Sequence, residues 1–405
     1  MADVSDKRPI SGARKEPGLA IFPTLLRLAL RAFLSRLRTA GEDITQQEPD
    51  FEASMKRLTG NPDVATHIAQ LRVLTLTGDA SGWQAAGINV NAGDKVTVLG
   101  TGSLWASKLF NLRFGPRIGL WLRIGEAGAI FKTPSEASTL TMASGGPLHM
   151  VAKPPGEWAD AQGRFDPAYP RQDISGEIRV CVIVWKSDPV AGLRAMLKAD
   201  PACDQIIASA LEEAIVPVST PRGWTYLWRL GQGAIYRDVK TNDSRHIHCH
   251  THQDVGILQF PADFALTENT RLTWRWKADK LPCDMAENIM PTHDYLSIAV
   301  EFDNGLDLTY MWSSTLAEGT IFQCPLPFWD KVETHWVLRS NPKELGKWLS
   351  EERPVRADYA RAIGEPPARI VRVWLIAVSV FQRGEGICDY ADIELVDGER
   401  RLKIT

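Results

Sequence analysis

Hydrophobic residues follow two different patterns along this chain. Before about residue 72, and again over residues 187–216, they recur at three- and four-residue spacing, which predicts amphipathic helices. Elsewhere they form short runs separated by Gly, Pro and Asn, which predicts β-strands. In the first β-rich part we expect strands at 73–76, 87–90, 95–99, 120–124, 138–142, 148–151 and 176–184. The pattern predicts a mainly β protein with two β-sandwich domains, an N-terminal amphipathic helix and a helical linker.

The chain of 405 residues is too long for one ordinary hydrophobic core. The changes in pattern divide it into four segments. We expect a basic tail with amphipathic helices at 1–71, a first sandwich at 72–186, a helical linker at 187–223 and a second sandwich at 224–405. Within the first segment, Asn61-Pro62-Asp63 is a start signal for a helix over 64–71.

The segment 19–38 is basic, and after Pro23 its pattern predicts an amphipathic helix. Leu26, Leu30, Phe33 and Leu37 lie on one side, and arginines lie on another. The arginines make the segment unlike a secretory signal and too charged to span a bilayer. Contact with an anionic membrane surface and packing on the protein's own body or on a second subunit both remain open. We expect a cytoplasmic protein, with peripheral contact at the inner membrane as the alternative.

Composition excludes several classes of protein. The net charge of −3 gives no indication of nucleic-acid binding. The six Cys are widely spaced without a Cys-x-x-Cys pair, which favours free thiols in a reducing compartment over a disulfide framework. Nucleotide-binding loops and the signatures of serine hydrolases, kinases and zinc proteases are absent, so no nucleotide cofactor is expected. A divalent metal is the cofactor that the sequence leaves open.

Half of the eight His lie in one stretch of seven residues. His246, His248, His250 and His252 occupy every second position, so in a β-strand all four imidazoles share one face. Imidazole is a common ligand of transition metals and the usual general acid or base near neutral pH. Three interpretations stay open: a metal site, a metal-free site for proton transfer or binding, and a solvated strand face.

A second cluster of His and carboxylates lies farther along the chain. His293 and Asp294 precede an apolar strand, and Asp284 and Glu287 lie nearby. Residues at such junctions of loop and strand often carry function. The candidate catalytic residues are therefore His248, His250, His293 and Asp294.

Aromatic residues supply the candidates for substrate binding. The alternation of Leu272, Trp274 and Trp276 with polar residues predicts a strand with two large rings on one face. Those rings belong to a sandwich core if the face is covered, and form a binding platform if it is open. With the platform interpretation, the candidate substrate-binding residues are Trp274, Trp276, Tyr310, Trp312 and Arg339.

Two resemblances refine this picture. Residues 83–98 carry a Trp followed by Gly-Ile-x-Val-x-x-Gly-Asp-x-Val, and with 102–105 they resemble the start of the galactophilic bacterial lectin (PA-I type) jelly roll. The resemblance covers about 72–186 and implies a jelly-roll fold. That family binds galactose through calcium held by an Asn- and Asp-rich loop. Residues 152–160 lack that run, so no calcium ligands are carried over.

The C-terminal half resembles the bacterial domain-of-unknown-function 3047 family. The matching stretches are 272–277, 293–302, 310–312, 337–340, 346–348, Glu351 with 356–359, and 389–393. The resemblance spans about 224–398 and implies a second jelly roll, without an established activity.

Three hypotheses for function follow. The first is an enzyme of hydrolase, lyase or hydratase type that uses a His and carboxylate site on a glycan or an apolar small molecule. The second is a protein that binds carbohydrate or another ligand without catalysis. The third is a structural protein of the cell envelope held by the basic helix. The row of His favours the first, whereas fold analogy favours the second. A homo-oligomer remains open.

Overall fold

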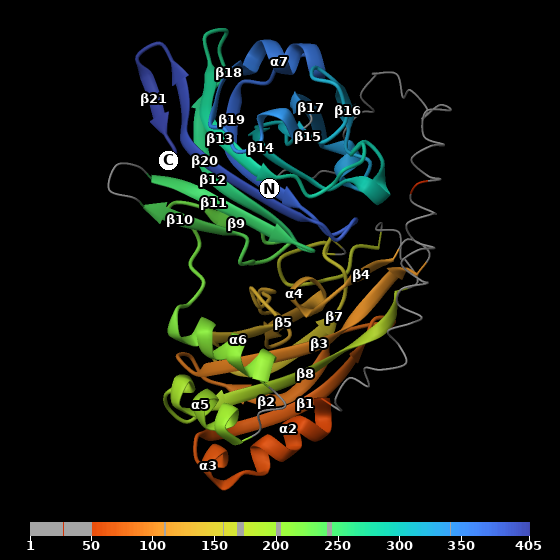
Figure 1. Ribbon diagram of the computed structural model, residues 1–405, viewed down its shortest axis with the longest axis vertical. Helices are drawn as coiled ribbons and strands as arrows, with labels where there is room; N and C mark the ends of the chain where they lie inside the picture. The colour runs from red at the N-terminus through yellow and green to blue at the C-terminus, as the bar shows by residue number, and fades with distance from the viewer. Residues whose placement is uncertain are drawn as a thin grey trace. The chain divides into compact units, whose positions relative to one another are not determined.

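The computed structural model describes residues 27, 51–108, 111–156, 158–167, 174–199, 204–240, 245–340 and 342–405. The basic segment 19–38, with the helix expected after Pro23, lies outside these residues, apart from Arg27. The described residues form two units (Figure 1). The N-terminal unit contains 51–219 and 228–234, and the C-terminal unit contains 220–227 and 235–405. The predicted mainly β fold is confirmed.

The N-terminal unit contains two sheets. The first has the strand order β1 (Ile68–Thr77), β8 (Ser175–Trp185), β3 (Lys95–Ser107) and β4 (Leu112–Phe114), with β6 (Ala137–Thr141) also paired to β3. The second has the order β2 (Gln84–Val90), β7 (Gly146–Ala152) and β5 (Leu120–Ile124), next to the short helix α4 (Pro116–Gly119). Strands therefore form where the short hydrophobic runs predict them.

Helices cover one face of the first sheet. They are α2 (Phe51–Gly60), α3 (Pro62–Ala65), α5 (Pro189–Ala199) and α6 (Asp204–Ile215). Met55, Leu193 and Ile207 pack with Cys181 and Ile183 of β8 in one buried cluster. The segment 187–223, which the sequence predicts as a helical linker, therefore contributes α5 and α6, and both helices pack on this sheet.

The helix predicted over 64–71 is largely wrong. The side chain of Asn61 accepts a hydrogen bond from the backbone of Asp63, so the start signal is real. The helix nevertheless ends at Ala65, and β1 begins at Ile68, where the chain pairs with Trp185 of β8. Tertiary pairing therefore overrides the local helical pattern.

The C-terminal unit is a sandwich of two larger sheets. The six-stranded sheet has the order β10 (Tyr236–Lys240), β11 (Arg245–His252), β20 (Glu385–Asp397), β13 (Arg271–Lys280) and β18 (Leu349–Pro354), with β21 (Arg400–Lys403) paired to β20. The seven-stranded sheet has the order β16 (Ile321–Gln323), β17 (Glu333–Ser340), β15 (Asp307–Ser313), β14 (Tyr295–Phe302), β19 (Arg369–Val378), β12 (Val255–Ala265) and β9 (Thr225–Tyr226). Helix α7 (Val355–Ala362) follows β18, and three short 3-10 helices occur at Met290–Thr292, Trp329–Lys331 and Pro342–Glu344.

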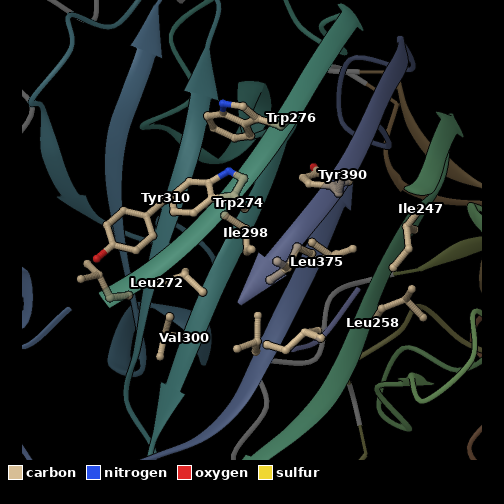
Figure 2. Close-up of a cluster of buried hydrophobic side chains, with 14 of the residues drawn as sticks. Ile247, Leu258, Leu272, Trp274, Trp276, Ile298, Val300, Tyr310, Leu375 and Tyr390 are labelled. Atoms are coloured by element: carbon tan, nitrogen blue, oxygen red, sulfur yellow. The ribbon is translucent and has the colours of Figure 1, made fainter. Parts of the chain in front are cut away.

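The hydrophobic core of this unit lies between the two sheets (Figure 2). The ring of Trp274 stacks on Tyr310 with 5.7 Å between ring centroids, and Trp276 meets Trp312 at 5.4 Å. All four side chains are at most 1% exposed. The core interpretation is therefore correct and the platform interpretation is wrong, because each sheet covers the rings of the other.

Alternation along the strands separates the two faces of the six-stranded sheet. On β11, Ile247 and Cys249 point into the core, so the interleaved His side chains lie on the opposite face. On β13, Trp274 and Trp276 point inward, and Arg275 and its alternate neighbours point outward. Within the described part of the chain, none of the helices combines the length and apolar character that a membrane span requires.

Candidate functional site

The four His of β11 form a row on the outer face of the six-stranded sheet, as their spacing predicts. His246 and His248 are partly buried, whereas His250 and His252 are exposed. The neighbouring strand β20 runs antiparallel, with His248 opposite Asp389 and His252 opposite Glu385. This register places carboxylates beside the imidazoles.

Asp389 is the centre of the first group of charges. Its Oδ1 atom lies 2.7 Å from Nδ1 of His248 and 3.6 Å from Nε2 of His246. Its Oδ2 atom lies 3.1 Å from Nζ of Lys277, which also pairs with Asp279 at 3.0 Å. Burial alone would raise the pKa of Asp389, but the hydrogen bonds from His248 and Lys277 outweigh it and lower the pKa. Asp389 is therefore held as a carboxylate.

This contact fixes the orientation of the His248 ring. A carboxylate can only accept a hydrogen bond, so Nδ1 of His248 is the donor in the 2.7 Å contact with Asp389. In the neutral ring, the lone pair is then on Nε2. A carboxylate that orients an imidazole in this way is a common arrangement for a general base.

A second group of charges lies farther along the same face. Glu385 accepts hydrogen bonds from Nε2 of His250 at 2.8 Å and from Nζ of Lys280 at 2.6 Å. Hydrogen bonds from Lys280 and His250 lower the pKa of Glu385 to about 2. Both His248 and His250 are therefore paired with carboxylates, but only the His250–Glu385 pair is exposed, since Asp389 is buried.

The four side chains His246, His248, His250 and His252 are not placed to hold one metal ion together. Alternate residues of a strand are about 6.7 Å apart along its axis, too far for one ion without convergence of the side chains. The four side chains do not converge on one point, because His246 and His248 both approach Asp389 whereas His250 turns to Glu385. Among the described residues, three potential ligand groups come within 4.8 Å of one another only at His293, Cys324 and His335.

An exposed tryptophan lies beside the row. Trp348 is 39% exposed, and its ring centroid lies 6.0 Å from that of His246. The guanidinium of Arg275 lies 5.1 Å from the Trp348 ring and also donates to Asp392 at 2.6 Å. The backbone N–H of Gly346 donates to the carbonyl of Ala278, which attaches the loop carrying Trp348 to β13. We call this outer surface the open face. It comprises His246, His248, His250, Arg275, Lys277, Lys280, Trp348, Glu385 and Asp389.

The other two predicted catalytic residues lie on the other sheet. His293 and Asp294 precede β14 and are fully buried. Asp294 accepts backbone hydrogen bonds from Phe381 and Gln382 at 2.9 and 2.6 Å. Burial raises the pKa of Asp294 to about 7 despite these bonds. We infer that Asp294 holds the loop before β20, since its two oxygens are occupied by backbone groups.

His293 belongs to a second group of side chains, which we call the buried His–Cys cluster. It comprises His293, Cys324, Glu333 and His335, each at most 3% exposed. Nε2 of His293 lies 3.4 Å from Sγ of Cys324, and the His293 and His335 rings are 4.9 Å apart. Burial lowers the pKa of His293 to about 4, so this imidazole is neutral at physiological pH. The structure therefore does not join His293 to His248 and His250 in one site.

Two ring nitrogens in this cluster have no hydrogen-bond partner. Both belong to His335, which is fully buried between Phe322, Tyr295 and His293. A buried polar group without a partner costs about 1–3 kcal/mol. The neighbouring carboxylate of Glu333 accepts hydrogen bonds from Tyr295 at 2.9 Å and Thr309 at 3.2 Å. The buried His–Cys cluster is thus only partly satisfied by protein groups.

Arg339, the remaining predicted substrate-binding residue, is ion-paired. Its Nε atom donates to Oε1 of Glu351 at 2.7 Å, and that same oxygen accepts from the indole of Trp276. A second contact joins Arg339 to Glu344 at 3.5 Å. These contacts connect β17 to β18, so we infer that Arg339 ties the two sheets together.

Comparisons with known proteins found one matching family and several similar solved structures. Residues 225–394 match the family described as "Protein of unknown function (DUF3047)". The predicted resemblance of the C-terminal half is thereby confirmed. None of the curated proteins matches the chain.

Several solved structures are similar to parts of the chain. One is the N-terminal domain of EclA, a PllA-like lectin, with 17% identity, coverage of 28% of this chain and 94% of that chain, and a TM-score of 0.21. Another is the xyloglucanase domain of NopAA from Sinorhizobium fredii, with 6% identity, 44% and 94% coverage and a TM-score of 0.28. A third is the family 30 carbohydrate-binding module of a Clostridium thermocellum cellulase, with 10% identity, 45% and 90% coverage and a TM-score of 0.24.

Sequence reasoning missed several residues that complete the open face and the buried His–Cys cluster. Asp389 and Trp348 fall within the family-like stretches, but nothing local connects them to the His row. Cys324 and His335 are isolated in the sequence and are brought to His293 by strands β16 and β17. Pairing of Phe322 with His335 across these strands could be found only with knowledge of the sheet order.

Proposed function

We propose that the open face of the C-terminal unit binds a carbohydrate chain. The observation that carries this proposal is the exposed ring of Trp348 beside His246 and Arg275. Binding sites for small ligands combine exposed aromatic surface with a few fixed polar groups. A sugar ring offers apolar C–H groups for an indole and hydroxyls for neighbouring polar side chains.

The polar groups of the open face are held in fixed positions. His248 and Lys277 both contact Asp389, and Lys277 also contacts Asp279. These groups extend over three neighbouring strands, β11, β20 and β13, so a ligand can lie across the sheet. Fixed donors and acceptors lose little side-chain entropy when a ligand binds.

The charges on this face favour a neutral glycan over an acidic one. Lys277, Lys280 and Arg275 are each paired with a carboxylate on the same face. An anionic ligand would have to compete with those carboxylates for the cations. A neutral polysaccharide can use the same groups as hydrogen-bond donors and acceptors without breaking the pairs.

The test is binding of the full chain to a panel of polysaccharides by affinity electrophoresis and calorimetry. The panel contains cellulose, xylan, xyloglucan and galactan, with alginate as an acidic comparison. We expect at least one neutral polysaccharide to bind, and Trp348→Ala to weaken that binding about tenfold or more. Trp329→Ala is the matched control, since this partly exposed tryptophan of the same unit lies in the 3-10 helix Trp329–Lys331, against Trp374 of the seven-stranded sheet. Absence of binding across the panel, or equal binding by Trp348→Ala, would contradict the proposal.

The contact between His248 and Asp389 favours a second candidate function, acid–base catalysis on the bound glycan. With Nδ1 donating to Asp389, Nε2 of His248 is the atom that would take a proton from substrate. Asp389 would act as a positioning residue for that base. Loss of a general base typically lowers the rate about 10²- to 10⁴-fold.

Catalysis is tested by following new reducing ends and unsaturated products on every polysaccharide that binds. We expect His248→Ala to lower turnover about 10²- to 10⁴-fold, a much larger change than its effect on binding. Asp389→Asn should lower kcat and change its pH profile, since it removes the carboxylate that orients the ring. A wild-type protein that binds but releases no product over days would leave binding as the function and exclude catalysis on the glycans tested.

A further inference from the structure

The buried His–Cys cluster has donor atoms at the spacing that a metal ion needs. Zinc binds imidazole nitrogen at about 2.0–2.1 Å and thiolate sulfur at about 2.3 Å. Tetrahedral geometry then separates the nitrogen and the sulfur by about 3.6 Å. Nε2 of His293 and Sγ of Cys324 are 3.4 Å apart, and the ligand atoms of His293, Cys324 and His335 all lie within 4.8 Å of one another.

The orientation of His293 suits a ligand. Its Nδ1 lies 2.5 Å from the backbone carbonyl of Glu287, which can only accept, so Nδ1 is the donor. The lone pair of the neutral ring is then on Nε2, the atom that faces Cys324. Histidines that bind metals are commonly held by a backbone carbonyl on their other nitrogen in this way.

His335 provides the independent observation. It is fully buried, and neither of its ring nitrogens has a hydrogen-bond partner. Its Nε2 atom lies 3.5 Å from Oε1 of Glu333 without forming a hydrogen bond. A protein-only arrangement leaves the lone pair of this imidazole unused, whereas a bound ion would take it.

Glu333 is the carboxylate beside these three residues, with its Oε1 atom 3.5 Å from Nε2 of His335. Its carboxylate is 3% exposed, and Tyr295 and Thr309 hold it in place by hydrogen bonds to Oε1. One carboxylate and one thiolate balance the charge of a divalent cation. Because all four groups are buried, the set has no position open to solvent, as in structural zinc sites.

We propose that His293, Cys324, His335 and Glu333 bind one structural Zn²⁺ ion. Binding displaces the proton of the Cys324 thiol, and the ion ties β16 and β17 to the segment that precedes β14. The ion adds a cross-link over the outer face of the seven-stranded sheet. This site is separate from the open face and does not depend on glycan binding there.

The experiment measures metal content of the purified, untagged full chain by plasma mass spectrometry. We expect about one equivalent of zinc in the wild type and a loss of at least fivefold in Cys324→Ser and in His335→Gln. The matched controls are Cys283→Ser, a buried cysteine of the same unit, and His250→Ala, a member of the exposed row. Both should retain zinc, and so should Trp348→Ala.

A second measurement does not depend on whether the variants fold. Exchange of zinc for Co²⁺ in the wild type should produce the absorption of a thiolate-bound, four-coordinate cobalt ion. The proposal is overturned if the wild type holds less than a tenth of an equivalent after reconstitution, or if cobalt shows no thiolate band. Zinc retained in both ligand variants, or lost in His250→Ala instead, would also overturn it, as would stoichiometric binding of another metal in place of zinc.

Discussion

The outer faces of the two sheets of the C-terminal unit carry similar residue types in opposite surroundings. On the open face, His248 and His250 each pair with a carboxylate, and the His250–Glu385 pair is exposed to water. On the seven-stranded sheet, His293 and His335 are fully buried beside Glu333 and Cys324. The first face satisfies its polar groups with each other and with solvent. The second leaves both nitrogens of His335 without a hydrogen bond.

This difference shows why local density of His is a poor guide to metal binding. A metal ion needs donors that converge, whereas a β-strand spreads alternate side chains along one face. Donor side chains from separate parts of the sequence can converge on one ion, whereas alternate side chains of a single strand do not. An unpartnered buried imidazole is also more costly than an exposed one, which makes it the stronger indication of a missing ligand.

The tryptophans on either side of the six-stranded sheet give the largest expected effect. Trp276→Ala should lower the free energy of unfolding by about 3–5 kcal/mol, because it leaves a cavity in the core beside Trp312. Chemical denaturation followed by circular dichroism measures this. Trp348→Ala on the open face should change the same quantity by less than about 0.5 kcal/mol. Equal effects would mean that the two faces do not differ as described.

Removal of metal should have the next largest effect on stability. This effect should come from the buried His–Cys cluster and not from the open face. With free zinc at a hundred times Kd, bound zinc should raise the free energy of unfolding of the wild type by about 2.7 kcal/mol. Removal of the zinc with a chelator should lower it by the same amount. For a unit of this size that corresponds to a fall in Tm of about 5–11 °C, measured by calorimetry. Cys324→Ser should start from the lower Tm and show no further response. A chelator effect of the same size in both proteins would place the metal elsewhere.

Asp389 gives a test based on pH. Its pKa in the folded protein is lowered, so its contribution to stability is complete above its unfolded pKa of about 3.9 and is lost as the pH falls through the folded value. We expect Asp389→Ala to destabilise the protein by about 1–2 kcal/mol at pH 7 and by progressively less below about pH 4. Denaturation curves of both proteins between pH 7 and pH 2 measure the difference. If the difference in free energy of unfolding between the two proteins stays constant down to pH 2, the charge of the Asp389 carboxylate is not involved.

Trp348 should dominate ligand binding on the open face. Trp348→Ala removes the exposed ring beside His246 and should weaken glycan binding about tenfold, equivalent to about 1.4 kcal/mol. Titration calorimetry with the polysaccharide that the panel selects gives the affinity. His246→Ala is expected to weaken binding less, since it keeps the indole ring of Trp348. The reverse order would move the centre of the site toward the His row.

The smallest effect is expected at the exposed end of the row. His250→Ala removes one exposed pair with Glu385, and surface pairs contribute about 0–1 kcal/mol. The midpoint of chemical denaturation should therefore change very little. The change should also decrease in high salt, where an exposed pair is screened. A large fall in this midpoint would show that the row is structurally coupled to the core.

Much of the fold follows from the sequence by itself. The alternation around Trp274 and Trp276 determined a strand with one apolar face, and the spacing of the His row determined that four imidazoles share a face. Both results depend on backbone geometry, in which side chains two residues apart point the same way. Local signals also located most strands of the N-terminal unit. The helix predicted over 64–71 does not extend past Ala65, because β1 begins at Ile68 and pairs with β8.

Only the tertiary structure decided which faces are covered and which side chains meet. The second sheet covers Trp274 and Trp276 and turns a possible platform into core. Antiparallel pairing of β11 with β20 gives His248 its carboxylate, 141 positions along the chain. Sheet order likewise brings Cys324 and His335 to His293. Burial and long-range contact depend on how distant strands pair, and a local pattern contains no information on that pairing.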